Sequence, residues 1–147
     1  MDDTIARIEA EVAMLLRLAD RNRRTGDALE GTLDRSAYLL LGRLATDGAT
    51  NVNTLAGRLC LDPSTVTRQV LAMEADALVL RGRDPQDGRA TLVTATDRGR
   101  AELAATRAAR AALYAEMLAA WSPDDRTRMA ELLARLNADL DARVRGA

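Results

Sequence analysis

The sequence contains no histidine, no lysine and no phenylalanine, and its single cysteine is Cys60. Without histidine, and with one thiol, the chain cannot form the usual acid–base or metal-binding sites, and it has no glycine-rich phosphate loop. A lone cysteine also excludes an internal disulfide framework, which agrees with a reducing compartment. We therefore expect no enzymatic activity, no metal and no cofactor.

Aromatic side chains and long apolar runs are scarce as well. The aromatic residues are Tyr38, Tyr114 and Trp121, which leaves none between positions 39 and 113 for stacking on the bases of single-stranded RNA. No uninterrupted apolar run approaches the roughly 18 residues that span a bilayer. The start, Met1-Asp2-Asp3, is acidic and unlike a signal peptide. These absences predict a cytoplasmic protein with no membrane partner.

The chain does contain much alanine and leucine, and its 21 basic residues are all arginine. Apolar residues make up 48% of the 147 residues, which is enough for a core, and the length suits one domain. Alanine and leucine favour long helices that pack closely. The net charge is −1, so overall charge does not by itself indicate a nucleic-acid partner.

Apolar periodicity predicts a mainly α-helical fold with one small β-hairpin. The predicted helices cover residues 4–25, 34–46, 63–76 and 97–120, with a short helix behind Asn53 and a last helix from Ser122. Residues 50–52 are too few to predict more than an extended link. Two β-capable runs between Val79 and Thr94, separated by Asp, Pro and Gly, predict the hairpin.

The central third of the chain has the layout of a winged helix-turn-helix. Asp62 is a good N-cap and Pro63 suits the first helical position, so a second helix should start after a tight turn. Val66, Val70 and Met73 should point inward. The outward positions near the helix start would then be Ser64, Thr65, Thr67, Arg68 and Gln69. The hydroxyl and guanidinium groups among them can reach base edges or phosphates in a major groove. A solvated helix face is the alternative interpretation of the same side chains.

Three arginines mark the hairpin, namely Arg81, Arg83 and Arg89. We expect Asp87, two positions before Arg89, to orient that guanidinium for a narrow minor groove. Good turn chemistry alone explains the Asp, Pro and Gly residues of the loop, but it does not explain the arginines.

These motifs resemble the MarR family of multiple antibiotic resistance regulators. Asp62–Arg68 looks like the opening of that family's recognition helix, and Arg83–Ala90, with Arg98-Gly99-Arg100 downstream, resembles its wing and the following helix. One departure is Ala75–Leu78, which stands where such regulators often have a glycine-containing turn.

The resemblance implies a homodimeric, sequence-specific regulator of double-stranded DNA that grips a pseudo-palindromic operator. Residues 1–147 would form one domain, with a DNA-binding lobe at about 34–95 and dimerisation helices at about 1–30 and 97–147. The resemblance places Ser64, Thr65, Thr67 and Arg68 in the major groove. It assigns Arg83, Asp87 and Arg89 to the wing, with Arg89 in the minor groove. It also implies a repressor released by a small phenolic or amphipathic ligand.

Other interpretations remain open on the residues alone. Tyr38 and Arg17 are weak candidates for contacts with an effector, although Tyr38 also suits the edge of a core. A redox-responsive regulator would depend on Cys60, which we expect to be buried and inert. A winged helix used only for protein contacts would not need an arginine-rich hairpin. The long apolar stripes of the terminal helices independently predict an interface between two copies of the chain.

Overall fold

The computed structural model describes residues 2–25 and 27–147, which divide into two compact units, residues 1–31 and 32–147. The first unit holds helix α1 (Asp3–Thr25) and the short 3-10 helix η1 (Asp27–Leu29). Along α1, apolar side chains such as Ile8 and Leu15 are exposed. The predicted helix over 4–25 is therefore confirmed, and its apolar stripe is not covered within this unit.

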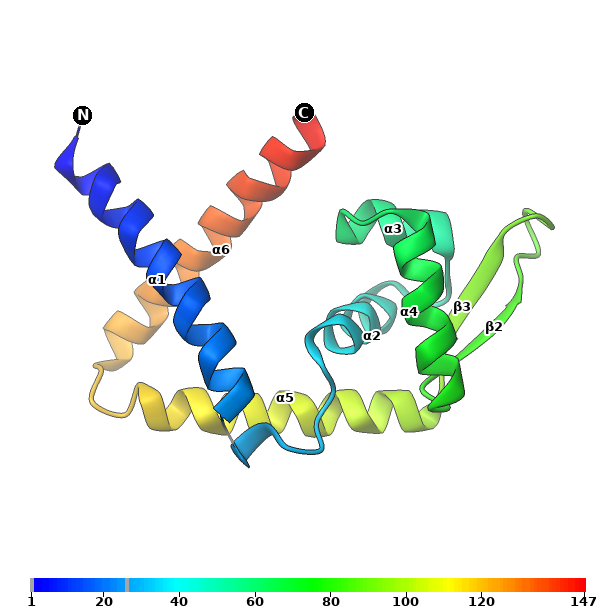
Figure 1. The fold of residues 1–147 in the computed structure, drawn as a ribbon, viewed down its shortest axis with the longest axis horizontal. Coiled ribbons are helices and arrows are strands. Elements are labelled where there is room, and N and C mark those ends of the chain that lie inside the picture. Colours follow the sequence, from blue (N-terminus) through cyan, green and yellow to red (C-terminus); the bar gives the residue numbers. More distant parts are fainter. Residues whose placement is uncertain (1, 26) are drawn as a thin grey trace. The chain divides into compact units, whose positions relative to one another are not determined.

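The second unit contains five further helices and three strands (Figure 1). In chain order these are α2 (Arg35–Asp47), β1 (Thr50–Asn51), α3 (Val52–Leu59), α4 (Pro63–Ala75), β2 (Val79–Arg83), β3 (Thr91–Ala95), α5 (Asp97–Met117) and α6 (Pro123–Gly146). The mainly helical fold with a hairpin wing is confirmed. The long helix predicted to reach residue 120 ends earlier, at Met117.

The strands form one antiparallel sheet in the order β1-β3-β2. β2 pairs with β3 from Val79 opposite Ala95 to Arg83 opposite Thr91, as the predicted hairpin requires. β1 pairs with the other edge of β3, with Thr50 opposite Val93. Residues 50–52 were predicted as no more than an extended link; Thr50 and Asn51 are extended and also pair with β3, whereas Val52 begins α3.

The core lies where α2, α3 and α4 pack against the sheet. Its fully buried side chains are Leu40, Leu41, Leu55, Val66, Val70, Val79 and Val93. Leu103 of α5 joins this cluster, whereas α6 has no buried residue. The helix-turn-helix and its hairpin thus share one hydrophobic core, which holds α4 in a fixed position relative to the strands.

Side-chain caps define most of the helix starts in this unit. Asp34, Thr96 and Ser122 each accept a hydrogen bond from a backbone N–H three residues ahead. At α3 the cap is Asn51, whose Oδ1 accepts from Thr54 N at 2.8 Å, so this helix begins at Val52 rather than behind Asn53. The cap that we expected at Asp62 makes no side-chain hydrogen bond.

Helix α5 approaches the turn after α4 very closely. A Cβ at Gly99 would collide with the carbonyl oxygen of Leu78, so only glycine fits there. Thr96 reinforces the contact, because its hydroxyl donates to Ala77 O at 2.6 Å and its N–H donates to Leu78 O at 3.1 Å. This contact fixes the point from which the hairpin leaves the core. Over the described residues, no helix is long and apolar enough to cross a membrane.

Candidate nucleic-acid interface

Helix α4 presents one polar face away from the core. A three-residue turn precedes it, and in this turn Cys60 adopts a left-handed conformation (φ 53°) and Leu61 N donates to Ala56 O at 3.0 Å. Val66, Val70 and Met73 are buried, as the sequence predicts. Because a helix repeats every 3.6 residues, the opposite positions share one exposed face, and they are Ser64, Thr67, Arg68 and Leu71.

The predicted site residues on α4 differ in what they can offer. Ser64 and Arg68 are exposed, and no hydrogen bond or ion pair engages their side chains among the described residues. Thr67 is exposed but donates its hydroxyl hydrogen to Pro63 O at 2.9 Å, which leaves its oxygen and methyl group available. Thr65 is half-buried. Exposed Leu71 was not singled out from the sequence, because an apolar residue carries no signal for a DNA-facing position.

The wing loop is a tight structure stabilised by its two aspartates. Asp84 Oδ1 accepts from Gln86 N at 2.9 Å, and its other oxygen accepts from Asn51 Nδ2 at 3.3 Å. Asp87 Oδ1 accepts from the backbone N–H of Arg89 at 3.1 Å. Asp87 was expected to orient the guanidinium of Arg89, and in this structure its carboxylate holds the backbone of the turn that carries Arg89.

The three hairpin arginines are not equivalent. Arg81 forms a bidentate ion pair with Glu74 of α4, with Nε–Oε2 and Nη2–Oε1 distances of 3.0 Å each. The pair lowers the pKa of Glu74 and raises that of Arg81, chiefly through this side-chain hydrogen bonding. Arg83 and Arg89 are exposed and without an ion-pair partner in the described part of the chain. The resemblance assigned Arg83 and Arg89 to the wing, and these are the two hairpin arginines whose guanidinium groups are available to a polyanion.

A groove of about 350 Å³ runs between the end of α4 and the hairpin. Its lining includes the three arginines and a single acid, Glu74. The groove is therefore positively charged although the whole chain carries a net charge of −1. A local excess of guanidinium groups suits a phosphate backbone.

The two residues predicted to contact a ligand, Tyr38 and Arg17, belong to different units of the chain. Tyr38 is half-buried against the core, and the guanidinium of Arg110 lies 4.9 Å from its ring centroid, which is cation–π geometry. Arg17 is exposed on α1, in the other unit. The environment of Tyr38 is that of a residue at the edge of a core.

Cys60 is exposed, so the expectation that it is buried was wrong. As the residue that ends α3, it points its thiol toward α6, where Sγ lies 3.6 Å from Asp141 Oδ1. Asp141 also pairs with Arg145 at 2.8 Å, and Arg145 donates to the carbonyl oxygen of Gly57 at 2.8 Å. Burial therefore gives no reason to regard this cysteine as inert.

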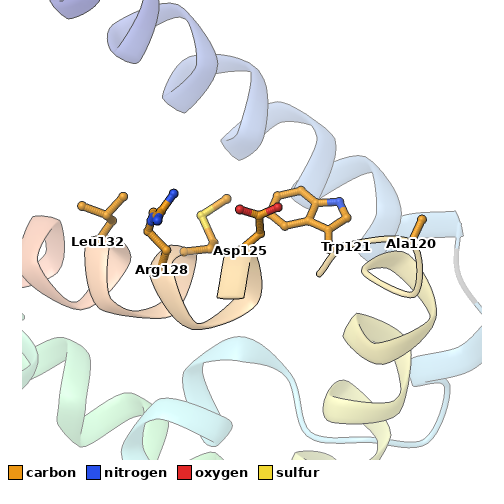
Figure 2. A pocket seen from close by; sticks show the side chains of 6 residues that line it. Ala120, Trp121, Asp125, Arg128 and Leu132 are labelled. Atoms are coloured by element: carbon orange, nitrogen blue, oxygen red, sulfur yellow. The ribbon is translucent and has the colours of Figure 1, made fainter. Parts of the chain in front are cut away.

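The α5–α6 corner carries an apolar surface that this unit leaves open. Trp121, Met129 and Leu132 line a hollow of about 460 Å³ together with the charged residues Asp125 and Arg128. Figure 2 shows the labelled side chains rising from the start of α6 and the loop before it. Farther along α6, Leu140 and Val144 are at least half exposed. Such a continuous apolar face is typical of a surface that another polypeptide covers.

Comparison with known proteins connects this geometry to one family. Residues 33–91, which hold α2, the helix-turn-helix and the hairpin up to the start of β3, match the model of the MarR family. An uncharacterized helix-turn-helix-type transcriptional regulator of Bacillus subtilis, YxaD, is 43% identical over 107 residues, covering 73% of this chain and 75% of that protein.

Two solved structures share the fold. The PcaV transcriptional regulator of Streptomyces coelicolor, solved with its natural ligand, is 25% identical at a TM-score of 0.64, covering 82% of this chain and 89% of that one. A MarR family protein of Bacillus stearothermophilus is 24% identical at a TM-score of 0.72, covering 92% and 96%.

Proposed function

The chain belongs to the MarR family and is a DNA-binding transcriptional regulator, and we propose that it acts as a homodimeric repressor that binds a pseudo-palindromic operator. One observation carries the proposal. The start of α4 exposes Ser64, Thr67 and Arg68, and the hairpin that follows α4 carries a groove lined by Arg81, Arg83 and Arg89. Two such lobes related by two-fold symmetry would read two half-sites about one helical turn apart.

We assign major-groove contacts to the start of α4. Ser64, Thr67 and Arg68 are exposed there, and Thr65 is half-buried at the edge of the same face. Arg68 can donate two hydrogen bonds to one guanine, a contact that contributes about 1–3 kcal/mol of discrimination between bases. The hydroxyl groups and the first-turn N–H groups of the helix would contact phosphates or base edges.

We assign the wing contacts to Arg83 and Arg89, with Asp87 as the residue that shapes the loop. The Asp87 carboxylate holds the N–H of Arg89, so the turn that presents Arg89 is fixed before DNA binds. Arginine at the tip of such a loop suits a narrow, electronegative minor groove.

The remaining assignments concern assembly and control. Residues 34–95 would form the DNA-binding lobe, and residues 1–30 and 97–147 would form the dimerisation region, whose apolar faces are exposed in the single chain. A small phenolic or amphipathic effector would release the repressor. The PcaV structure, which contains a natural ligand, supports this kind of control. The chain would act through binding rather than catalysis, as the names of its relatives also suggest.

The experiment that tests the proposal is selection of bound duplexes from a random pool, followed by titration of the selected sequence at several salt concentrations. We expect a two-fold symmetric site and an affinity that falls steeply with salt, because phosphate contacts release counterions. Equal binding of all duplexes, or none, would contradict the proposal. That result would favour a winged helix that binds proteins.

Arg89→Ala tests the wing within the same assay. We expect the affinity for the selected duplex to fall severalfold or more, while Tm stays nearly unchanged, because the exposed guanidinium makes no ion pair in the described structure. Arg135→Ala on α6 is the matched control, since it removes an equal charge from an exposed position outside the proposed DNA-binding lobe, and light scattering checks that the oligomeric state of this variant is unchanged. An unaltered affinity in Arg89→Ala would remove the wing from the mechanism.

A further inference from the structure

The Glu74–Arg81 pair joins the recognition helix to the wing. Glu74 lies in the last turn of α4, and Arg81 is the middle residue of β2. Both terminal oxygens of the carboxylate accept a hydrogen bond from the same guanidinium, each at 3.0 Å. A bidentate pair fixes both distance and orientation, whereas a single contact fixes only the distance.

The position of the Glu74–Arg81 pair along β2 lets it restrain the orientation of the wing tip. Side chains alternate across a strand, so Val79, Arg81 and Arg83 share one face. Val79 is fully buried and anchors the base of the strand, while Arg83 is exposed toward the loop. Arg81 lies between them, at the point where the strand leaves the core, so a contact there limits how far the outer half can swing.

Besides the Glu74–Arg81 pair, β2 is supported along one edge, at its base and at its loop end, where Asp84 accepts a hydrogen bond from Asn51 Nδ2 at 3.3 Å. In the sheet order β1-β3-β2, the strand is an edge strand and pairs only with β3. At its base, the connection from α4 is short, with Leu78 N donating to Met73 O at 2.9 Å. Beyond that turn, the Glu74–Arg81 pair is the polar contact that joins α4 to the hairpin among the described residues.

We propose that Glu74 is a positioning residue for DNA binding, which acts through Arg81 to fix the hairpin relative to α4. This inference rests on the proposed function. The hairpin arginines and the start of α4 can bind the same DNA duplex together only if the angle between the hairpin and α4 stays fixed. The Glu74–Arg81 pair fixes this angle, and Glu74 itself makes no contact with the DNA.

If only its charge mattered, removing Glu74 would strengthen DNA binding, whereas a positioning role predicts weaker binding. Glu74 is the only acid lining a groove that also holds Arg81, Arg83 and Arg89. Removing a negative charge from a DNA-facing surface should strengthen binding to phosphates. A positioning role instead predicts weaker binding when Glu74 is removed, so the sign of the change separates the two explanations.

The test compares Glu74→Ala with Asp76→Ala on the selected duplex. Asp76 is an exposed acid two residues farther on, so its removal changes the net charge equally but does not break the pair. We expect Glu74→Ala to lower the affinity at least severalfold and Asp76→Ala to leave it unchanged or slightly stronger. Equal or tighter binding by Glu74→Ala would overturn the inference, although it would leave the DNA-binding function intact.

A double-mutant cycle excludes a merely structural explanation. In the wild-type background, Arg89→Ala should lower affinity severalfold, but in the Glu74→Ala background it should change little, because the wing is no longer held in place. The exchanged pair, Glu74→Arg with Arg81→Glu, should restore most of the affinity lost by Glu74→Ala. Equal losses from Arg89→Ala in both backgrounds would refute the positioning role. If the wild type itself prefers no duplex, the proposed function fails first.

Discussion

Ala77 adopts a backbone conformation that L-residues avoid. Its φ of 59° is in the left-handed region, at the turn between α4 and β2. The turn is held by Ala77 N donating to Glu74 O at 3.0 Å and by the Thr96 hydroxyl donating to Ala77 O. The surrounding contacts therefore impose a conformation in which a Cβ costs roughly 1–2 kcal/mol.

Ala77→Gly should raise the stability of the protein. Glycine removes the Cβ strain from the folded state, but its greater conformational freedom also stabilises the unfolded chain. The difference between the two effects is an expected net gain of about 0.5–1 kcal/mol in the free energy of unfolding. Denaturant unfolding measures it. The matched control is Ala72→Gly in the interior of α4, which should cost about 1 kcal/mol. A loss of stability in Ala77→Gly would show that strain at position 77 is not significant.

The sequence predicts single residues well where their role follows from helix period. Val66, Val70 and Met73 are buried as expected, because their spacing fixes one face of α4. It fails where the role depends on a distant partner. Cys60, expected to be buried, is exposed and contacts Asp141 of α6, some 80 positions later. No local pattern in the chain encodes this contact.

Whole elements show the same contrast. The hairpin and the longer helices were predictable, because turn residues and apolar periodicity are local signals. β1 was not, since its two residues form a strand only by pairing with Leu92 and Val93, about 40 positions away. The wing is therefore part of a three-stranded sheet, which anchors it to the start of α3.

The stability that the Glu74–Arg81 ion pair adds to the fold should depend on pH. Pairing with Arg81 holds the pKa of Glu74 below its usual range, so the stabilisation is present above the ordinary carboxyl pKa of about 4.3 and is lost as pH falls through the lower, folded-state value. We expect Glu74→Gln to have a lower Tm than the wild type near neutral pH. That difference should shrink as pH falls from about 6 toward about 3. A difference that is constant across this range would show that ionisation of Glu74 does not stabilise the fold.

At the level of the whole molecule, a large apolar surface remains without cover. α6 has no buried residue, and its exposed apolar side chains include Met129, Leu132, Leu133, Leu140 and Val144. In α1 the exposed set includes Ile5, Ile8, Leu15 and Leu18. Monomeric proteins rarely leave stripes of this length in water, so each helix has a face that suits association of two copies.

Leu140→Asp should split the dimer and thereby abolish tight DNA binding. Leu140 is 50% exposed in the single chain, so the substitution costs the protomer little, but at an interface it would bury an unpaired carboxylate. Light scattering should report a monomer, and affinity for the symmetric duplex should fall to that of one half-site. Ala138→Asp, which adds the same charge on the opposite, exposed side of α6, should remain dimeric and bind normally. If Leu140→Asp stays dimeric, the interface does not include this face of α6, and the two lobes must be related in another way.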